Sequence, residues 1–507
     1  MKRVYFLILL FISFSLCGCK FFSNLFGGDD DDELVTQTVY TQTKGDVYLV
    51  KLNNSNEIIK GENTGYVTEV SRSAVEENKE YNDTDFYVRD LNNKVNEFLI
   101  KESSSRVAQL TIGNGVKTLN DEKDDTNDFY VFVSDDKLQK VPCVCKYVTN
   151  HCIVYADKDN SRFNINDLAY EKIAKKFENC YVNETSIIGS PIYESYVSDY
   201  CVPCTSKITI VVSDLFRDGK QKDNQGTVGY HYTGDFFKQE VFEQSNEREI
   251  FYVDAAFLAE DEDYIYTTEV HEFNHLINFV IKTINRMTAN KTVPNKTQTC
   301  DVWFTEMLAM TTEDMFQSYL NLDDMHTPKA RLPYFGLGYY YGFTSWKNQK
   351  LDPLIMYANT YAFGAFLARN FGGINLIKQI AQNNYVNEEA ITKALQTLYP
   401  NQGYDFTYAL RKFTLCVVNT DYNKDYTLNR STGLNSDKLG FTAVNIKESI
   451  QYNGKTYNIP LIFKSDEDGQ LDLYPYGFTV HYVDTNISSF ELVASTNDSL
   501  EYYCVEK

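Results

Sequence analysis

One uninterrupted stretch, TTEVHEFNHLINFVIKTINRM at residues 267–287, most limits the structures that this chain can form. It contains no proline or glycine, so it predicts a continuous helix with Thr267 or Thr268 as the N-cap. Residues four apart lie on the same face of a helix. The imidazoles of His271 and His275 are therefore expected side by side, with Glu272 next to the first of them.

The pattern His-Glu-x-x-His is typical of zinc sites that hydrolyse peptide bonds. Two imidazoles one helical turn apart can bind a single zinc ion, and the carboxylate between them can act as general base toward a water molecule. The alternative is a chance pair of helical histidines, which is disfavoured because only six histidines occur in 507 residues. We therefore predict zinc on His271 and His275, with Glu272 as the base.

A catalytic zinc ion normally has three protein ligands, so the sequence should supply one more. The glycine and histidine that extend the motif in metzincins are replaced here by Asn278 and Ile281, which excludes that class. A second predicted helix, VWFTEMLAMTTED, carries Glu306 among apolar residues. A desolvated carboxylate needs a charged partner, and a metal provides one. Glu306 is the predicted third ligand; an exposed helical glutamate is the alternative.

Several other side chains are candidates for supporting roles. Asp301 fits the N-cap of the second helix, and Glu313 or Asp314 could hydrogen-bond a ligating histidine. The aromatic segment YFGLGYYYGFTSW, residues 334–346, could line a peptide cleft or form a core hairpin. The preferred stabiliser of the reaction's oxyanion is Tyr361, and the other candidates by residue type are Tyr357, His231 and His326.

The N-terminus MKRVYFLILLFISFSLCGCK is typical of an export signal, because two basic residues precede a short apolar run. The tetrapeptide LCGC resembles the lipobox of bacterial lipoproteins, which implies a signal peptide of residues 1–18 and a lipid on Cys19. A cleaved signal that releases a soluble product is the alternative. Glycines and an acidic run in residues 19–35 predict a flexible tether. We expect an exported protein that is lipid-anchored to a bacterial membrane or cell surface.

Charge and cysteine content narrow the possible partners. The formal charge of −22 disfavours nucleic acid, because phosphate binding requires clustered lysine and arginine.

Of the eleven cysteines, nine remain after Cys17 and Cys19, so at least one thiol should be unpaired. The pair Cys201 and Cys204 in CVPC is expected to form local disulfides with the cluster at 143–152; half of a zinc site or a redox motif is the alternative.

Residue patterning divides the rest of the chain into three regions and predicts an α+β fold. Short alternating segments at 36–120 predict an N-terminal β domain, and alternation returns in a C-terminal β domain at 433–507. Between them, residues 128–420 combine buried-strand candidates with helical segments and end in three successive helices. This central region holds the predicted zinc site.

The central region resembles the hyicolysin-type zinc metallopeptidases, a family within the gluzincins. The resemblance rests on HEFNHLINF, on WFTEMLA followed by ED, and on YAFGAFLARNFGG, with support from GTVGYHYTGDFF and NEREIFYVDAAFL. It spans residues 128–418. It implies a zincin-like core and one zinc ion held by His271, His275 and Glu306, with Glu272 as the base.

Two functions follow from these observations. The first is a lipid-anchored zinc endopeptidase that hydrolyses peptide bonds of protein substrates through a metal-activated water. The second is a surface binding or adhesion lipoprotein whose zincin core is an inactive scaffold. Intact His271, Glu272 and His275 favour the first, because loss of activity would usually remove one of them.

Overall fold

The computed structural model describes residues 34–40, 46–61, 64, 66–67, 85–105, 109–134, 137–219, 226–346, 351–419, 426–433, 438–464, 471–484 and 489–506. Within them, helices and strands are mixed, and the predicted α+β class is confirmed. The predicted signal peptide, Cys19 and residues 19–33 of the predicted tether lie outside the described residues.

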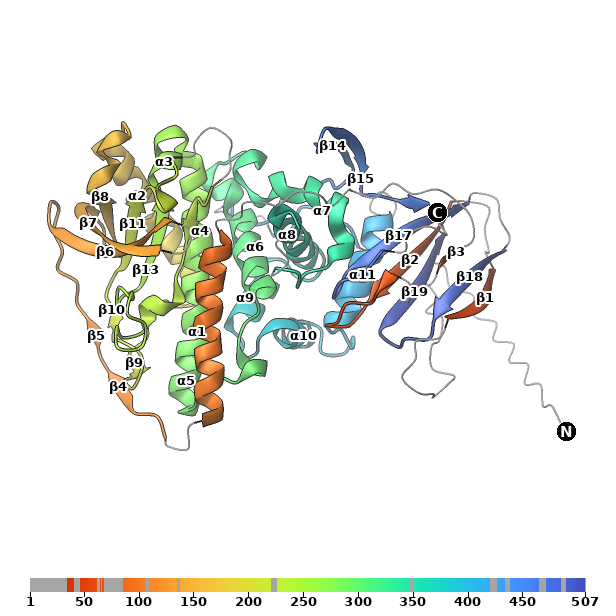
Figure 1. The fold of residues 1–507 in the computed structure, drawn as a ribbon, viewed down its shortest axis with the longest axis horizontal. Helices are drawn as coiled ribbons and strands as arrows, with labels where there is room; N and C mark the ends of the chain where they lie inside the picture. The colour runs from red at the N-terminus through yellow and green to blue at the C-terminus, as the bar shows by residue number, and fades with distance from the viewer. Residues whose placement is uncertain are drawn as a thin grey trace.

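A six-stranded sheet forms one end of the molecule (Figure 1). Its central strands β8 (Cys152–Asp157), β11 (Ile208–Ser213) and β13 (Ile250–Asp254) run parallel and are buried along their whole length. Such runs of apolar residues are expected for strands covered on both faces. The remaining strands are antiparallel: β12 (Gly229–Tyr230) at one edge, and β7 (Lys137–Val148) and β6 (Thr126–Ser134) at the other.

Two helices pack against this sheet, and the second of them carries His271 and His275. Helix α2 (Asp167–Ile187) follows β8 and begins at the N-cap Asn166, whose side chain accepts a hydrogen bond from Ala169 N. Helix α4 (Glu262–Phe279) follows β13 and the short helix α3 (Ala255–Glu260). The N-cap of α4 is Asp261, so the prediction of Thr267 or Thr268 was wrong. Polar residues 261–263 begin the helix nearly two turns earlier.

Helix α4 continues beyond its last regular turn. A π-helical turn, Val280–Ile284, joins it to α5 (Asn285–Asn290), so the predicted continuous helix is present with one irregular segment. Helix α6 (Val302–Leu320) then lies alongside α4, and its N-cap is Asp301, as predicted.

The helical lobe that follows has one more break than predicted. Helix α7 (Leu332–Gly338) precedes α8 (Pro353–Asn370), α9 (Ile374–Gln382), α10 (Asn387–Leu398) and α11 (Phe406–Asn419). The first of the three predicted helices is divided into α8 and α9, because Gly372 and Gly373 adopt positive φ angles of 107° and 59°. Segment 334–346 does not form a hairpin and does not line the cavity beside His271; it belongs to α7 and a buried aromatic turn.

The two predicted β domains form a single unit at the other end of the molecule, with the helices between it and the six-stranded sheet (Figure 1). Strand β2 (Val47–Asn53) pairs with both β17 (Phe478–Asp484) and β19 (Leu500–Glu506). Strand β18 (Ser489–Ser495) pairs with β1 (Leu34–Tyr40) and β3 (Tyr66–Val67). Two separate domains were therefore the wrong division, because strands far apart in the sequence complete each other's hydrogen bonds.

Smaller elements complete the C-terminal region. Strand β16 (Phe463–Lys464) pairs with β17, and β14 (Glu448–Tyr452) forms a hairpin with β15 (Lys455–Ile459).

Residues 85–120, predicted as part of the N-terminal β domain, instead belong to the central region. They begin with the helix α1 (Asp85–Ser105), which buries Val88, Val95 and Leu99. Two short strands follow: β4 (Ile112–Asn114) pairs with β9 (Ser195–Val197), and β5 (Val116–Lys117) pairs with β10 (Cys204–Thr205).

The predicted local disulfides are absent. The cysteines of both groups are buried free thiols: Cys143, Cys145, Cys152, Cys201 and Cys204. The first three lie in β7 and β8, and their side chains are fully buried in the core beside the sheet. Cys204 lies in β10, and its thiol donates to the carbonyl oxygen of Pro191 at 3.8 Å.

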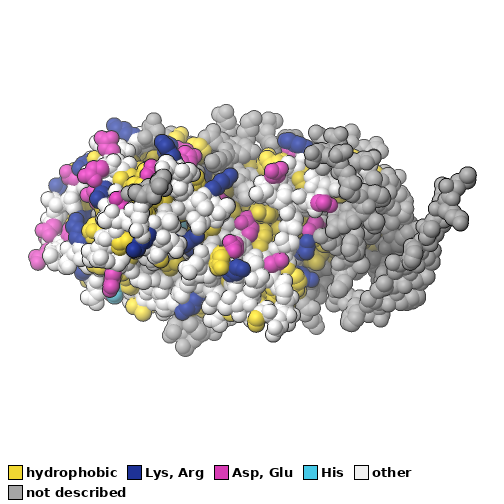
Figure 2. Space-filling model, turned by 90° about the horizontal axis from the view of Figure 1, so that it is seen from below, with side chains coloured by type: hydrophobic (Ala, Val, Ile, Leu, Met, Phe, Trp, Pro, Cys, Tyr) yellow, Lys and Arg dark blue, Asp and Glu magenta, His cyan; other side chains and the backbone are white. Residues whose placement is uncertain are grey.

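The described surface mixes both signs of charge. Acidic and basic side chains are interspersed over the face that Figure 2 shows, without a continuous basic patch there. Among the helices that the structure describes, none has the length and apolar character needed to cross a bilayer.

Candidate metal centre

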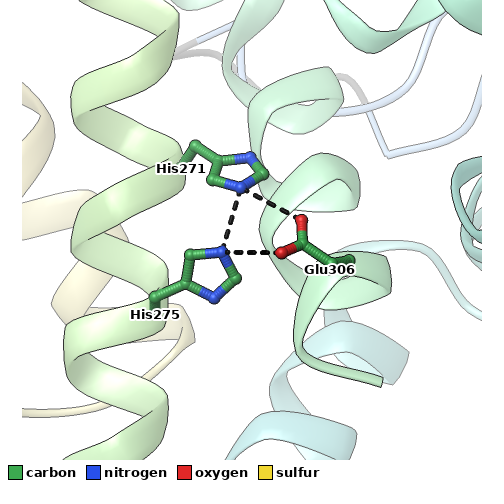
Figure 3. A group of neighbouring side chains, drawn as sticks. All are labelled: His271, His275 and Glu306. Atoms are coloured by element: carbon green, nitrogen blue, oxygen red, sulfur yellow. Dashed lines mark hydrogen bonds and ion pairs between the residues drawn. The ribbon is translucent and has the colours of Figure 1, made fainter. Parts of the chain in front are cut away.

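Side chains from α4 and α6 converge on one point (Figure 3). The Nε2 atoms of His271 and His275 lie 3.0 Å apart. His271 Nε2 is 3.3 Å from Oε2 of Glu306, and His275 Nε2 is 3.5 Å from its Oε1. The structure thus brings together the three residues that the sequence predicted as ligands.

These distances fit a tetrahedral zinc ion. Ligand atoms at about 2.0–2.1 Å from zinc lie roughly 3.3–3.4 Å from one another in a tetrahedron. The three observed separations are within a few tenths of an ångström of that value. In addition, Oε2 of Glu306 is buried and has no hydrogen-bond partner. A buried acceptor without a partner is costly, and coordination would satisfy it.

The charges of Glu306 and His275 suit a cation. Burial opposes ionisation of Glu306, but His275 and His271 outweigh it and lower the pKa of that carboxyl to about 2. Burial lowers the pKa of His275 to about 4. At neutral pH the centre therefore offers a carboxylate and a neutral imidazole, which are the forms that bind metal.

Glu313 holds His271 in place. Its Oε1 lies 2.6 Å from Nδ1 of His271, and its Oε2 accepts a hydrogen bond of 2.6 Å from the Thr267 hydroxyl. A carboxylate at Nδ1 fixes the tautomer that leaves the Nε2 lone pair for a metal. Despite burial, Glu313 and Glu306 raise the pKa of His271 well above its usual value, so this imidazole is cationic at neutral pH and must release its Nε2 proton when it binds a metal. Glu313 thus occupies the position predicted for either Glu313 or Asp314.

Asp314 and Tyr361 lie elsewhere, so their predicted roles were wrong. The Tyr361 hydroxyl donates to Oδ2 of Asp314 at 2.9 Å, and Arg369 Nη2 lies 2.8 Å from the same oxygen. All three side chains are fully buried, and none lines the cavity at the site. Position 314 follows 313 by 100° around α6, so its carboxylate faces α8 instead of α4.

Glu272 is positioned for proton transfer. It lines the same cavity as the three convergent residues, and only 6% of it is exposed. Burial raises the pKa of its carboxyl to about 8. Strand β12 packs closely against it, since a Cβ on Gly229 would lie 3.4 Å from Glu272 Cγ and 2.4 Å from Thr268 Cγ2. A buried carboxyl whose pKa lies near neutrality suits a general base.

The site opens into a cavity of about 340 Å³. Three of the candidate oxyanion stabilisers line it: His231, Tyr357 and His326. His231 follows the edge strand β12, and its Nε2 is buried without a hydrogen-bond partner. Burial lowers the pKa of His231 well below its usual value, so the ring is neutral. A neutral imidazole with an unused nitrogen can donate to developing negative charge.

Helix α1 forms a wall of the cavity that sequence reasoning missed. The Asn92 amide donates to the carbonyl oxygen of His231 at 2.9 Å and accepts from the Thr233 backbone N–H at 2.8 Å. The wall also includes Asp85 and Arg89. Apolar residues at helical spacing could have revealed the helix itself, but its place beside the site depends on tertiary packing.

Comparison with known proteins identifies the family of this chain. The model of the Peptidase M30 family matches residues 156–423, just over half of the chain, and the match includes the complete α4 and α6 helices. No curated protein matches the chain.

Proposed function

Because the chain belongs to the Peptidase M30 family, we propose that it is a zinc-dependent endopeptidase with a zincin-like core. The observation that carries the proposal is the convergence of His271, His275 and Glu306, whose ligand atoms all lie within 4.8 Å of one another. The six-stranded sheet supports the zincin-like core, since its antiparallel edge strand β12 lies against the helix that carries both histidines.

Each residue then has a defined task. Zinc, when bound, supplies Lewis acidity that polarises the scissile carbonyl and acidifies a water molecule. Glu272 takes a proton from the attacking water and passes it to the leaving amine. His231 donates a hydrogen bond to the oxygen that becomes negatively charged. Glu313 holds the ring of His271.

Metal analysis and proteolysis test the proposal. Purified protein should contain about one zinc per chain and should cleave casein; a chelator should stop cleavage, and added zinc should restore it. Glu272→Gln should retain zinc but lose at least about 100-fold in rate, because general-base catalysis contributes roughly 10²–10⁴-fold. Glu260→Gln is the matched control, because Glu260 is exposed at the end of α3 and does not line the cavity.

Two outcomes would contradict the proposal. Equal background cleavage by the wild type and Glu272→Gln, with zinc bound, would support an inactive scaffold that serves binding or adhesion. Absence of stoichiometric zinc or another divalent metal would reject the metal centre itself.

We further propose that the enzyme is exported and attached to a bacterial membrane by lipid on Cys19. The basis is the N-terminal signal followed by LCGC. Mass spectrometry of the N-terminal peptide should find an acylated cysteine at position 19, and Cys19→Ala should move the protein from the membrane fraction to the soluble fraction. An unmodified mature N-terminus would contradict this.

A further inference from the structure

The cavity contains a guanidinium group without a counter-ion. Arg331 ends a 3₁₀ turn, Pro328–Arg331, and lines the cavity together with Glu272 and the three convergent residues. Its Nη1 atom is buried and has no hydrogen-bond partner. Among the described residues, the ion pairs of the cavity acids do not include Arg331, and its guanidinium lies 5.0 Å from the centre of the Tyr357 ring.

Neighbouring carboxylates do not supply the missing charge. Asp85 accepts hydrogen bonds from the Tyr357 hydroxyl at 3.1 Å and from the Thr227 hydroxyl at 2.6 Å. Glu306 and Glu313 are engaged with the two histidines. Of the four acids that line the cavity, Asp85, Glu306 and Glu313 have polar contacts other than Arg331, and Glu272 forms no ion pair with Arg331.

A second guanidinium adds to the positive charge. Arg89 Nη1 donates to the Tyr357 hydroxyl at 3.1 Å, and its guanidinium lies 5.8 Å from the centre of the same ring. Two cations thus contact one aromatic ring. Arg89 lines the same cavity as Arg331 and Glu306.

We propose that Arg331 is a specificity-determining residue that binds a carboxylate of the peptide substrate beside the scissile bond. The inference rests on the proposed peptidase function. A planar guanidinium forms two parallel hydrogen bonds with a carboxylate, which makes it the best suited side chain for this recognition. The carboxylate comes either from an acidic side chain or from the C-terminus of a short peptide, and the two sources share one chemistry.

The formal charge of −22 does not conflict with an acidic substrate. Charges more than about 8 Å apart in solvent are largely screened at physiological ionic strength, whereas a partly buried pair is screened much less. Local contacts in the cavity therefore decide the preference, and the net charge mainly affects the rate of encounter.

Paired peptides test the proposal. One pair carries Glu or Gln at the same position near the cleaved bond, with an amidated C-terminus, and the position is varied through the peptide. A second pair has neutral side chains and either a free or an amidated C-terminus. We expect the wild type to prefer the carboxylate in one pair by about tenfold or more in kcat/KM, because hydrogen bonds to charged groups are the strong ones.

Variants assign the preference to Arg331. In Arg331→Gln the acid-to-amide ratio should fall to about one, and Arg331→Lys should restore part of it. Lys296→Gln removes an equal charge from an exposed residue that does not line the cavity, so it should retain the wild-type ratio. Thermal melting of each variant checks that the fold is intact.

Binding separates this proposal from the proposed function. Fluorescence anisotropy of labelled peptides on Glu272→Gln, with and without Arg331→Gln, measures recognition without turnover. Tighter binding of the carboxylate peptide that disappears with Arg331→Gln supports the proposal even where no peptide is cleaved. An unchanged acid-to-amide ratio in Arg331→Gln, or a wild-type ratio near one in both pairs, overturns it.

Discussion

The hydrogen bond between Glu313 and His271 allows a quantitative prediction about zinc affinity. Glu313 is 5% exposed, and its two oxygens contact His271 Nδ1 and the Thr267 hydroxyl at 2.6 Å each. Loss of such a partner typically costs about 10–100-fold in metal affinity, or roughly 1.4–2.8 kcal/mol. Because the contact is short and buried, we expect Glu313→Ala to approach the upper limit. Glu313→Gln preserves shape and loses charge, so about tenfold is expected.

Competition with a chromophoric chelator measures the zinc dissociation constant of each variant. Ser318→Ala is a control in the same helix, because Ser318 is remote from the cavity lining and should leave the constant unchanged. At saturating zinc, cleavage by Glu313→Gln should recover further than cleavage by Glu313→Ala, whose His271 ring is free to turn. A dissociation constant for Glu313→Ala within twofold of the wild type would refute the reasoning.

Three further predictions concern stability. Asp314→Asn should lower the free energy of unfolding by about 3–5 kcal/mol in a denaturant titration, because it leaves the fully buried Arg369 without its counter-ion; a loss below 1 kcal/mol would contradict this. Gly229→Ala should cost about 1–3 kcal/mol in the same titration, since its Cβ would lie 2.4 Å from Thr268, and unchanged stability would show that β12 can move. Burial raises the pKa of Asp235 to about 7, so its contribution to stability is complete below the unfolded value of about 3.9 and is lost as the pH rises through 7. The stability of Asp235→Asn should therefore rise relative to the wild type between pH 4 and 7, and a constant difference would refute the assignment.

The convergence of His271, His275 and Glu306 could be predicted because their geometry is mostly local. The spacing of His271 and His275 places both rings on one helical face in any fold that keeps the helix. Glu306 required one more inference, that an acid among apolar neighbours must have a charged partner. Neither step needed knowledge of distant contacts, and the structure brings these three side chains together.

Other features depend on contacts that periodicity does not encode. Tyr361 and Asp314 were plausible near the candidate metal centre by residue type, but their positions on α8 and α6 direct them to Arg369. Arg331 and the α1 residue Asn92 reach the cavity only because segments outside the two ligand helices fold against it. The pairing of β2 with strands from the other end of the chain was equally hidden, since alternation identifies a strand but not its neighbour.

The placement of β2 between β17 and β19 also sets an order of events during synthesis. The first strands leave the ribosome long before β17 and β19, so this sheet cannot close until those two strands have been translated. The strands and helices of the central region are nearer to one another in sequence, so this region can fold first. Until β17 and β19 are made, the backbone groups of the early strands remain unpaired. A stop codon before β17 would leave those strands as exposed edges that favour aggregation.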